Sequence, residues 1–315
     1  MPTVGAIDCG TNSIRLLVAD IDPPAGTARD LDRRMEIVRL GQDVDRTGEL
    51  AVDALERTFA AAERYADACR RLGVQRIRFV ATSATRDAAN RDVFVDGIRQ
   101  RLGVDPEVIS GEEEASLSFA GATRELASGG GHPPYLVVDI GGGSTEVVRG
   151  SAHVDASVSV DIGCVRLTER HLHGDPPQAD EVAAACADIT AALDAVERAV
   201  PLDGVGTLVG LAGSVTTVAA HAMALERYDP HRIHGAHLPI ADVVTACDDL
   251  LMMNRQWRAA LPYMHPGRVD VIGAGALVWR EVIRRVRERS DLREVRVSEH
   301  DILDGIAWSV AQASA

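Results

Sequence analysis

Two glycine-containing segments carry the residue types that bind phosphate. They read Asp8-Cys9-Gly10-Thr11-Asn12-Ser13 and Asp139-Ile140-Gly141-Gly142-Gly143-Ser144. Glycine lets a backbone approach an anion closely, and successive amide groups in such a turn can point into one concavity. An aspartate at the end of the preceding strand supplies a hard oxygen ligand that suits magnesium. The spacing therefore predicts two phosphate-binding loops, each preceded by a candidate metal ligand, Asp8 in one and Asp139 in the other.

Three further segments could take part in phosphate chemistry. Gly213 and Ser214 follow a predicted strand and open a predicted helix, where terminal amide groups and the helix dipole favour an anion. The acidic run Glu112–Glu114 could supply a carboxylate that accepts a proton from water, although acids in a first helical turn also simply complement the dipole. Arg86 could neutralise phosphate charge with its fork of donors, or it could lie on a helix surface.

The elements that must position these residues alternate between strand and helix. Hydrophobic periodicity predicts strands at residues 3–9, 14–20, 35–40, 75–81, 106–110, 135–140, 145–150, 154–160 and 206–212. It predicts helices at residues 52–72, 87–103, 180–200 and 301–312, and others that begin near residues 112 and 213. The stretch Ala127–Pro134, rich in glycine and proline, is the best linker candidate. This order of elements is that of an α/β protein.

The pattern after the linker repeats the pattern before it. An offset of 131 positions separates Asp8 from Asp139 and Ser13 from Ser144. The same offset separates Ser83 from Ser214, each of which follows a predicted strand. An offset that is shared by separate pairs of motifs predicts an internal duplication of one α/β unit.

The composition restricts the classes of function. Apolar residues make up 46% and charged residues 25% of the 315 residues, which is typical of a soluble globular protein. The net charge of −14 argues against a nucleic-acid or membrane partner, but a small anion can still be held by amide groups, a metal and a few arginines. The sequence has no secretory leader, no apolar run that could cross a bilayer and no paired pattern among its five cysteines. A cytoplasmic location is therefore expected.

Taken together, these motifs resemble those of the exopolyphosphatase and guanosine pentaphosphate phosphohydrolase (Ppx/GppA) family, and in particular its short, actinobacterial-type exopolyphosphatases. The similar segments follow one another along nearly the whole chain: Ala6–Ile14, Ala81–Arg86, Ile109–Ala115, Val138–Glu146, Ile162–Arg166, Gly210–Ser214, Pro266–Ile272 and Val297–Glu299. The resemblance implies two duplicated ribonuclease H-like domains of the actin, sugar kinase and Hsp70 superfamily, with an active-site cleft between them. We expect the first domain to span residues 1–128 and the second residues 129–315, with the last helix packing on either domain.

The resemblance also implies roles for individual residues. Glu114 is expected to activate the attacking water as a general base, and Arg86 to neutralise phosphate charge. Asp139 and Glu146 are expected to hold magnesium, with Glu146 also counted among the catalytic residues and Asp8 as a weaker candidate for the same cluster. Glu146 could equally be an outward-facing strand residue, since its spacing alone does not separate the two interpretations.

The activity that the resemblance implies is magnesium-dependent hydrolysis of the terminal phosphoanhydride of inorganic polyphosphate, with release of orthophosphate. The chain stops soon after the last shared motif, as the short forms do, which favours short polymers. Guanosine pentaphosphate 5′-phosphohydrolase activity is the alternative within the same class, and the sequence does not separate the two. A sugar- or acetate-kinase-like transferase and a non-catalytic sensor of polyphosphate or alarmone are alternatives from other classes. The resemblance also implies a homodimer.

Three other features are interpreted as structural. The histidines at positions 221, 231, 234 and 237 match no motif of the family and are expected on the surface or in loops. The arginine-rich run Arg280–Arg289 is expected to form a solvated helix face. Cys9, inside the first loop, is expected to pack as a small apolar residue and not to act as a nucleophile.

Overall fold

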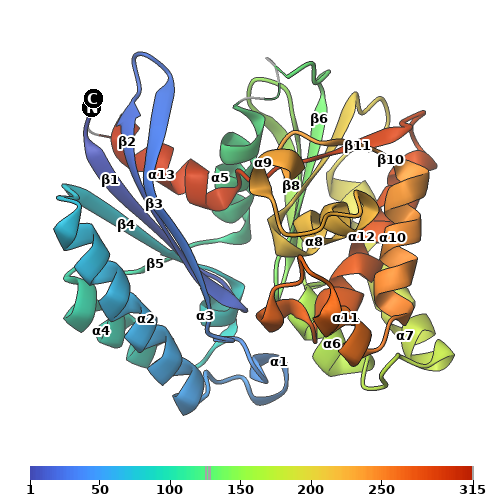
Figure 1. Cartoon of the computed structure of the whole chain (residues 1–315), viewed down its shortest axis with the longest axis horizontal. Coiled ribbons are helices and arrows are strands. Elements are labelled where there is room, and N and C mark those ends of the chain that lie inside the picture. Colours follow the sequence, from blue (N-terminus) through green and yellow to red (C-terminus); the bar gives the residue numbers. More distant parts are fainter. Residues whose placement is uncertain (125, 127–128, 314–315) are drawn as a thin grey trace. The chain divides into compact units, whose positions relative to one another are not determined.

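The chain divides into two compact units in the computed structural model, which describes residues 1–124, 126 and 129–313 (Figure 1). Unit 1 comprises Met1–Gly121 and the residues from Ile302 onward, and unit 2 comprises Ala122–Asp301. The last helix, α13 (Ile302–Gln312), therefore belongs to unit 1. Residues 127 and 128, in the predicted linker and at the predicted boundary, lie outside the described residues.

The centre of unit 1 is a five-stranded mixed sheet with the strand order β3-β2-β1-β4-β5. The strands are β1 (Thr3–Cys9), β2 (Ser13–Asp22), β3 (Thr27–Ile37), β4 (Arg76–Ala81) and β5 (Glu107–Val108). Strand β2 is antiparallel to both of its neighbours, β1 and β3, and β4 and β5 run parallel to β1. This arrangement of strands is that of a ribonuclease H-like fold.

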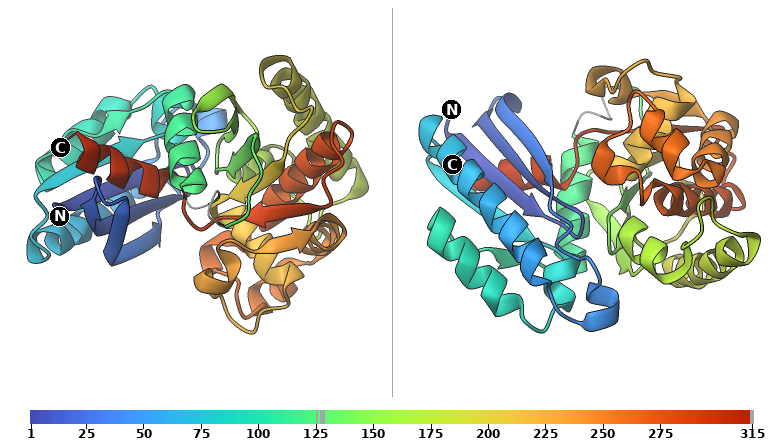
Figure 2. Two further views of the ribbon diagram at one scale, coloured as in Figure 1. Left: turned by 90° about the horizontal axis from the view of Figure 1, so that it is seen from above. Right: turned by 60° about the horizontal axis from the view of Figure 1, so that its bottom comes forward.

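Helices pack on both faces of the unit 1 sheet, because alternate residues of each strand face opposite sides. Ile7 and Cys9 of β1 belong to the core under α2 (Val52–Arg71) and α4 (Arg91–Leu102). Val4 and Ala6 belong to the core formed with α5 (Gly111–Thr123) and α13 (Ile302–Gln312), on the other side of the sheet (Figure 2). Two short helices complete the unit: α1 (Val44–Thr47) and α3 (Ser83–Asp87).

Unit 2 repeats the same sheet and adds one strand. Its strands are β6 (Tyr135–Ile140), β7 (Thr145–Gly150), β8 (Val154–Val160), β9 (Thr207–Leu211), β10 (His237–Pro239) and β11 (Glu294–Val297), in the order β8-β7-β6-β9-β11-β10. The first three are antiparallel, β9 and β11 run parallel to β6, and β10 is an added antiparallel edge. The shared order and directions confirm the predicted duplication.

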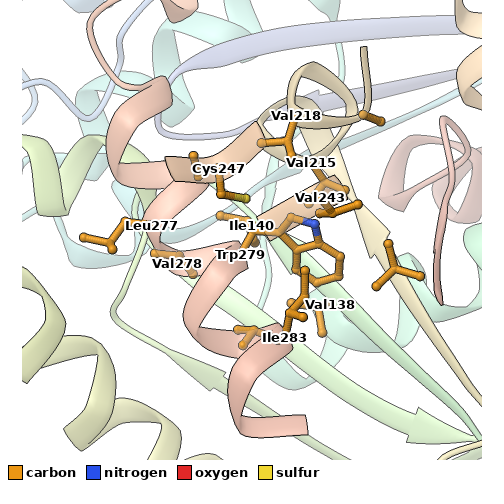
Figure 3. Close-up of a cluster of buried hydrophobic side chains, with 14 of the residues drawn as sticks. Val138, Ile140, Val215, Val218, Val243, Cys247, Leu277, Val278, Trp279 and Ile283 are labelled. Atoms are coloured by element: carbon orange, nitrogen blue, oxygen red, sulfur yellow. The ribbon is translucent and has the colours of Figure 1, made fainter. Parts of the chain in front are cut away.

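The core of unit 2 is built around helix α12 (Ile272–Arg287), whose Trp279 is fully buried. Its indole lies among side chains that include Ile140 and Val215 (Figure 3). A Cβ atom on Gly210 of β9 would come within 2.8 Å of the indole ring, so the strand can pass this closely only with glycine at that position. The other helices of unit 2 are α6 (Cys164–His171), α7 (Ala179–Ala199), α8 (Ala212–Ala222), α9 (Pro230–Ile233), α10 (Ile240–Met252), α11 (Arg255–Ala260) and the 3₁₀ turn η1 (Pro266–Arg268).

Strand β3 both begins and ends earlier in the chain than the sequence predicted. The prediction of a strand at residues 35–40 was wrong in its bounds, since β3 spans Thr27–Ile37. The strand is an edge of the sheet, and most of its residues are exposed or half-buried, so charged residues replace the apolar pattern. An ion pair of 2.5 Å joins Arg33 of this strand to Asp304 of α13.

The helix predicted at residues 87–103 is α4, which begins later, at Arg91, while Asp87 ends the separate short helix α3. The chain turns at residues 88–90, where the Asn90 side chain accepts a hydrogen bond from the Leu50 amide at 2.8 Å and donates one to the Leu50 carbonyl at 3.0 Å. Helices α6 and α10 were not predicted.

Two predictions about the chain as a whole can be compared with this fold. None of the described helices has the length and apolar character that a membrane span requires.

All five cysteines are free thiols. Cys9 is buried in the core of unit 1, where burial raises the pKa of its thiol well above the usual value. Its predicted packing role is confirmed.

Candidate active site

The loop Gly141–Ser144, here called loop 2, is held through its carbonyl groups. The carbonyl of Gly142 accepts a hydrogen bond of 2.8 Å from the amide of Val165, in the first turn of α6. The carbonyl of Gly143 accepts one of 2.8 Å from Nε of Arg166. In a planar trans peptide the N–H points opposite to the C=O. The amide groups that follow these two carbonyls therefore point away from α6, as a phosphate-binding loop requires.

Gly163 makes the close approach of loop 2 and α6 possible. A Cβ atom at this position would lie 2.2 Å from the carbonyl oxygen of Gly142. The φ angle of Gly163 is −111°, which any residue can adopt, so the requirement for glycine is purely steric. Gly163 lies in the segment Ile162–Arg166, which resembles the family, but its role was not predicted from the sequence.

The loop Gly10–Ser13, here called loop 1, is held in the same way by a different segment. The carbonyl of Thr11 accepts a hydrogen bond of 2.8 Å from the Gly41 amide, and the carbonyl of Asn12 accepts one of 2.9 Å from the Arg39 amide. The amide groups that follow these carbonyls again point to the opposite side. Both loops thus present backbone donors in the orientation expected for binding an anion.

Asp139 and Glu146 lie directly opposite each other on the antiparallel strands β6 and β7. Residues paired in this way extend their side chains on the same face of the sheet, about 5 Å apart at Cβ. Glu146 is 1% exposed and accepts a hydrogen bond of 2.7 Å from Oγ of Ser159. The two facing carboxylates supply hard oxygen atoms of the kind that suit Mg²⁺.

Asp8 occupies the equivalent place in unit 1, but its partner across the ladder is Arg15. The Arg15 guanidinium donates to Oδ2 of Asp8 through Nη2 at 2.6 Å and through Nε at 2.9 Å. The offset of 131 positions relates Arg15 to Glu146. Across from the aspartate, unit 1 has the positively charged Arg15, whereas unit 2 has a second carboxylate, Glu146.

Helix α5 buries only one of its three consecutive glutamates. Glu112 and Glu113 are exposed, and Glu113 forms an ion pair of 2.6 Å with Arg78. Glu114 is 8% exposed and lies on the same face of the unit 1 sheet as Asp8. This contrast separates the predicted general base from its neighbours, which behave as a solvated first turn.

Arg86 of α3 lies beside Glu114. Its Nη1 is 3.2 Å from Oε2 of Glu114 and donates to the Ile109 carbonyl at 2.9 Å. A neighbouring guanidinium favours the ionised carboxylate, which is the form that can accept a proton. The structure thus pairs two of the predicted catalytic residues with each other.

The N-terminus of α8 contains Gly213 and Ser214, next to a strained residue. Ala212 has φ +64°, a conformation that costs an L-residue roughly 1–2 kcal/mol. The Arg268 guanidinium covers Gly213 so closely that a Cβ atom there would lie 2.4 Å from its Cζ. Nη1 of Arg268 also donates to Oγ1 of Thr217 at 3.2 Å. Arg268 therefore adds a positive side chain to a helix N-terminus, where anions are already favoured.

Cys164 shows that the N-terminal ends of α6 and α8 are neighbours in unit 2. Burial raises the pKa of its thiol, while a hydrogen bond with Ser214 and the charge of Arg268 act in the opposite direction. Asp139 is paired in the sheet with Leu211, the residue that precedes α8. Loop 2, the α8 N-terminus, Arg268 and the Asp139–Glu146 pair thus belong to one region, at the carboxyl ends of parallel strands, where α/β proteins usually bind their ligands.

The predicted site residues are divided between the units. Asp8, loop 1, Arg86 and Glu114 belong to unit 1, whereas Asp139, Glu146, loop 2, Gly213 and Ser214 belong to unit 2. Within the described part of the chain, no group of three or more acidic, histidine or cysteine side chains is close enough to hold a metal. Arg15, Ser159 and Arg268 were not predicted from the sequence as site residues.

The other charged features have ordinary partners. The arginines of the Arg280–Arg289 run pair with acidic neighbours: Arg280 with Asp248, Arg284 with Glu281, and Arg285 and Arg289 with Glu197. The histidines lie in separate contacts: His221 with Tyr263, His234 with His300, and His237 with Glu294. His231 and His237 are exposed and His234 is half-buried, as expected for surface or loop residues, whereas His221 lies half-buried near the end of α8. The expectation of a solvated face was wrong for Arg280 and Arg285, whose side chains are only 11% and 15% exposed.

Comparison with known proteins agrees with this geometry. The model of the Ppx/GppA phosphatase family matches residues 17–310. The chain belongs to the Ppx/GppA phosphatase family. Exopolyphosphatase 2 of Mycobacterium tuberculosis is 52% identical over 317 residues, which cover 98% of each chain. The resemblance that the motifs indicated is confirmed.

Solved structures of Ppx/GppA proteins have the same fold. The crystal structure of an exopolyphosphatase-like protein has a TM-score of 0.95 at 42% identity, over 99% of this chain and 100% of that chain. The Aquifex aeolicus family member has a TM-score of 0.81 at 30% identity, over 99% of this chain and 98% of that one. As a Ppx/GppA protein, the chain is a hydrolase that acts on phosphoanhydrides.

Proposed function

We propose that this Ppx/GppA protein is an exopolyphosphatase that hydrolyses the terminal phosphoanhydride of inorganic polyphosphate and releases orthophosphate. The observation that carries the proposal is the Asp139–Glu146 carboxylate pair beside loop 2, whose amide groups point away from their anchoring helix. The similarity to Exopolyphosphatase 2 of Mycobacterium tuberculosis, at 52% identity, supports the choice of polyphosphate.

The residues would divide the work of the reaction between them. Amide groups of loop 2 and of the α8 N-terminus, with Arg268, would bind the terminal phosphate. Glu114 would take a proton from water, whose oxygen attacks the terminal phosphorus while the bridging P–O bond breaks. The shortened chain leaves with the bridging oxygen, and the products are orthophosphate and a polymer one phosphate shorter. Phosphoryl transfer depends mainly on positioning and charge stabilisation, and these groups can supply both.

Magnesium is the cofactor that we propose. Asp139 and Glu146 would hold it, since their oxygen atoms suit a hard divalent cation and their mutual repulsion calls for one. When bound, the ion neutralises phosphate charge and orients the anhydride. A cytoplasmic location, a preference for short polymers and a homodimeric state complete the proposal.

Guanosine pentaphosphate is the second candidate substrate. The protein from Vibrio atlanticus named guanosine-5′-triphosphate,3′-diphosphate pyrophosphatase is 38% identical over 173 residues, which cover 54% of this chain and 34% of that protein. Both substrates end in a phosphoanhydride, so the proposed groups could act on either. The preference must therefore be measured directly.

The test is phosphate release by the purified protein with magnesium, on short polyphosphate, long polyphosphate and guanosine pentaphosphate. We expect short polyphosphate to be the fastest substrate. Glu114→Gln should lower kcat by about 10²–10⁴-fold, the usual contribution of a positioned acid or base. Glu112→Gln is the matched control, because Glu112 is exposed on the same helix turn, and it should change kcat little. Tight binding of a substrate without release of phosphate would overturn the proposal in favour of a sensor.

A further inference from the structure

Residues 261–268 of unit 2, here called the strap, follow α11 and end with η1, whose last residue is Arg268. Arg268 lies against Gly213 at the N-terminus of α8, as described above. The Arg268 side chain is held at Thr217, and its position also depends on how firmly the backbone that carries it is fixed, because an arginine side chain is long and flexible. The strap is fixed at two points before it reaches Arg268.

The first point is Tyr263, whose hydroxyl is hydrogen bonded to Nδ1 of His221. His221 stands at the C-terminal end of α8, and its Nε2 is 3.5 Å from Oδ2 of Asp249 on α10. Tyr263 is 6% exposed, and burial raises the pKa of its hydroxyl to about 12, so it remains a donor at neutral pH. The strap is thus attached to the end of α8 opposite to the end that Arg268 covers.

The second point is His265, which caps η1. Its Nδ1 accepts a hydrogen bond of 3.1 Å from the amide of Gly267, and this turn carries Arg268. Only an imidazole whose Nδ1 has no proton can accept this bond. Burial, and then the charge of Arg268, lower the pKa of His265 from its ordinary value. Both effects favour the neutral imidazole, which is the form that can accept the Gly267 amide.

We propose that His265 is a positioning residue, which holds Arg268 against the N-terminus of α8 while its ring is neutral and releases it when the ring is protonated. A proton on Nδ1 would turn an acceptor into a donor that faces the Gly267 amide. The protonated His265 ring would also carry a positive charge beside the positive charge of Arg268, the residue whose charge lowers the pKa of His265. Both changes oppose the cap and push the guanidinium away from Gly213.

The consequence for the reaction rests on the proposed function, in which Arg268 binds substrate phosphate. Loss of its fixed position should weaken substrate binding and leave the chemical step unchanged, since Glu114 and the carboxylate pair lie on other elements. Acid should therefore raise KM more than it lowers kcat. This effect would adjust the enzyme to the acidity of its surroundings through one side chain that does not touch substrate.

The test compares three variants with the wild type, using tripolyphosphate between pH 5 and pH 8. Asparagine can cap a helix turn through its amide oxygen and does not titrate. His265→Asn should therefore keep a low KM over the whole range, whereas His265→Ala should show a KM raised about tenfold even at pH 8, as expected for loss of one charge-assisted contact. His237→Asn, an exposed histidine paired with Glu294, is the matched control and should follow the wild type.

Ionisation of tripolyphosphate and of Glu114 affects every variant alike, so the ratio of KM between His265→Asn and the wild type at each pH is the decisive quantity. A ratio that stays constant from pH 8 to pH 5 would overturn the inference, as would a normal KM for His265→Ala. If the wild type releases no phosphate at any pH, the proposed function fails. Calorimetric binding of tripolyphosphate to the same variants then decides the role of His265 separately, with the same expected ratio in Kd.

Discussion

The two loops of the duplicated fold differ most at one position across the neighbouring strand. In unit 1 Asp8 faces Arg15, and in unit 2 Asp139 faces Glu146. The first pair is a salt bridge of 2.6 Å, which carries its own counter-charge. The second pair concentrates negative charge and favours a cation. Both units therefore keep the same loop backbone, while the residue across the strand is an arginine in unit 1 and a glutamate in unit 2.

The two loops also differ in what holds them. Loop 2 is hydrogen bonded to the first turn of α6, whereas loop 1 is hydrogen bonded to residues 38–41, which follow β3. Gly163 and Gly41 stand at the respective contacts, and each leaves no room for a larger residue. The same orientation of loop amides is thus reached from two unrelated supports. Backbone geometry at the loop is therefore the property that the two units share.

Among the variants that test this comparison, the largest loss of activity is expected when the carboxylate charge of Glu146 is removed. Glu146→Gln keeps the size of the side chain and an acceptor for Ser159, but removes one of the two facing charges. Phosphate release should fall by about 10²–10³-fold, as is common when a group that stabilises transition-state charge is lost. The magnesium concentration for half-maximal rate should also rise. Ser159→Ala, which keeps the carboxylate, is the control, and an unchanged magnesium requirement in Glu146→Gln would remove this residue from the metal site.

The second prediction compares the two supporting glycines. Gly163→Ala places a methyl group against the backbone carbonyl of Gly142, which must move, so we expect a loss of about 1–3 kcal/mol in the free energy of unfolding and a higher KM. In Gly41→Ala the added methyl meets side-chain atoms of Thr11 and Ala84 and not a backbone carbonyl of the loop, so both effects should be smaller. Urea unfolding and steady-state kinetics measure the two. An equal loss in both variants would show that the loops do not differ in this respect.

The third prediction concerns the salt bridge of unit 1. Arg15→Gln leaves the Asp8 carboxylate, which is 4% exposed, without its bidentate donor. We expect the free energy of unfolding at neutral pH to fall by about 1–3 kcal/mol, the usual cost for a hydrogen bond to a charged group. Adding Asp8→Asn should restore part of the loss, because the buried charge is then also removed. If the double variant is no more stable than Arg15→Gln, the pair does not neutralise Asp8 in the way described.

The smallest effect is expected at the equivalent residues Ala81 and Ala212, each at a strand-to-helix junction. Ala212 has a positive φ angle, which glycine adopts without cost, so Ala212→Gly should leave the free energy of unfolding unchanged or raise it slightly. Ala81 ends strand β4 and is fully buried, so Ala81→Gly should lower the free energy of unfolding by about 1 kcal/mol. Thermal and urea unfolding of the two variants measure the contrast. Equal destabilisation would mean that the strain at Ala212 is not relieved by glycine.

The sequence predicted the elements whose signal is local. Strands β1 and β6 were placed at their observed bounds, because their apolar residues and the glycine turns that follow them are adjacent in the chain. Strand β3 was misplaced because a charged edge strand has no apolar alternation. The duplication was predicted because its two copies share one offset, and the paired strand order confirmed it.

The sequence predicted those residues of the candidate site that lie in recognisable motifs, and it did not predict the residues that support them. The pairing of Arg15 with Asp8 follows from strand register, which a linear motif does not express, although the offset from Glu146 would have indicated it. Gly163 and Arg268 were quoted in family-like segments but received no role. Their importance arises from contacts with Gly142 and Gly213. These contacts depend on packing between helices and loops that are distant in the sequence.

Helix α13 has a consequence for how the chain is made. The core on one face of the unit 1 sheet consists largely of α13 residues, among them Ile302, Ile306 and Trp308. A ribosome completes all of unit 2 before it reaches these residues, since unit 2 ends at Asp301. The unit synthesised first is therefore the last that can finish folding, in contrast to the usual N-terminal-first order. The contacts between α13 and this face of the unit 1 sheet are therefore among the last to form during synthesis.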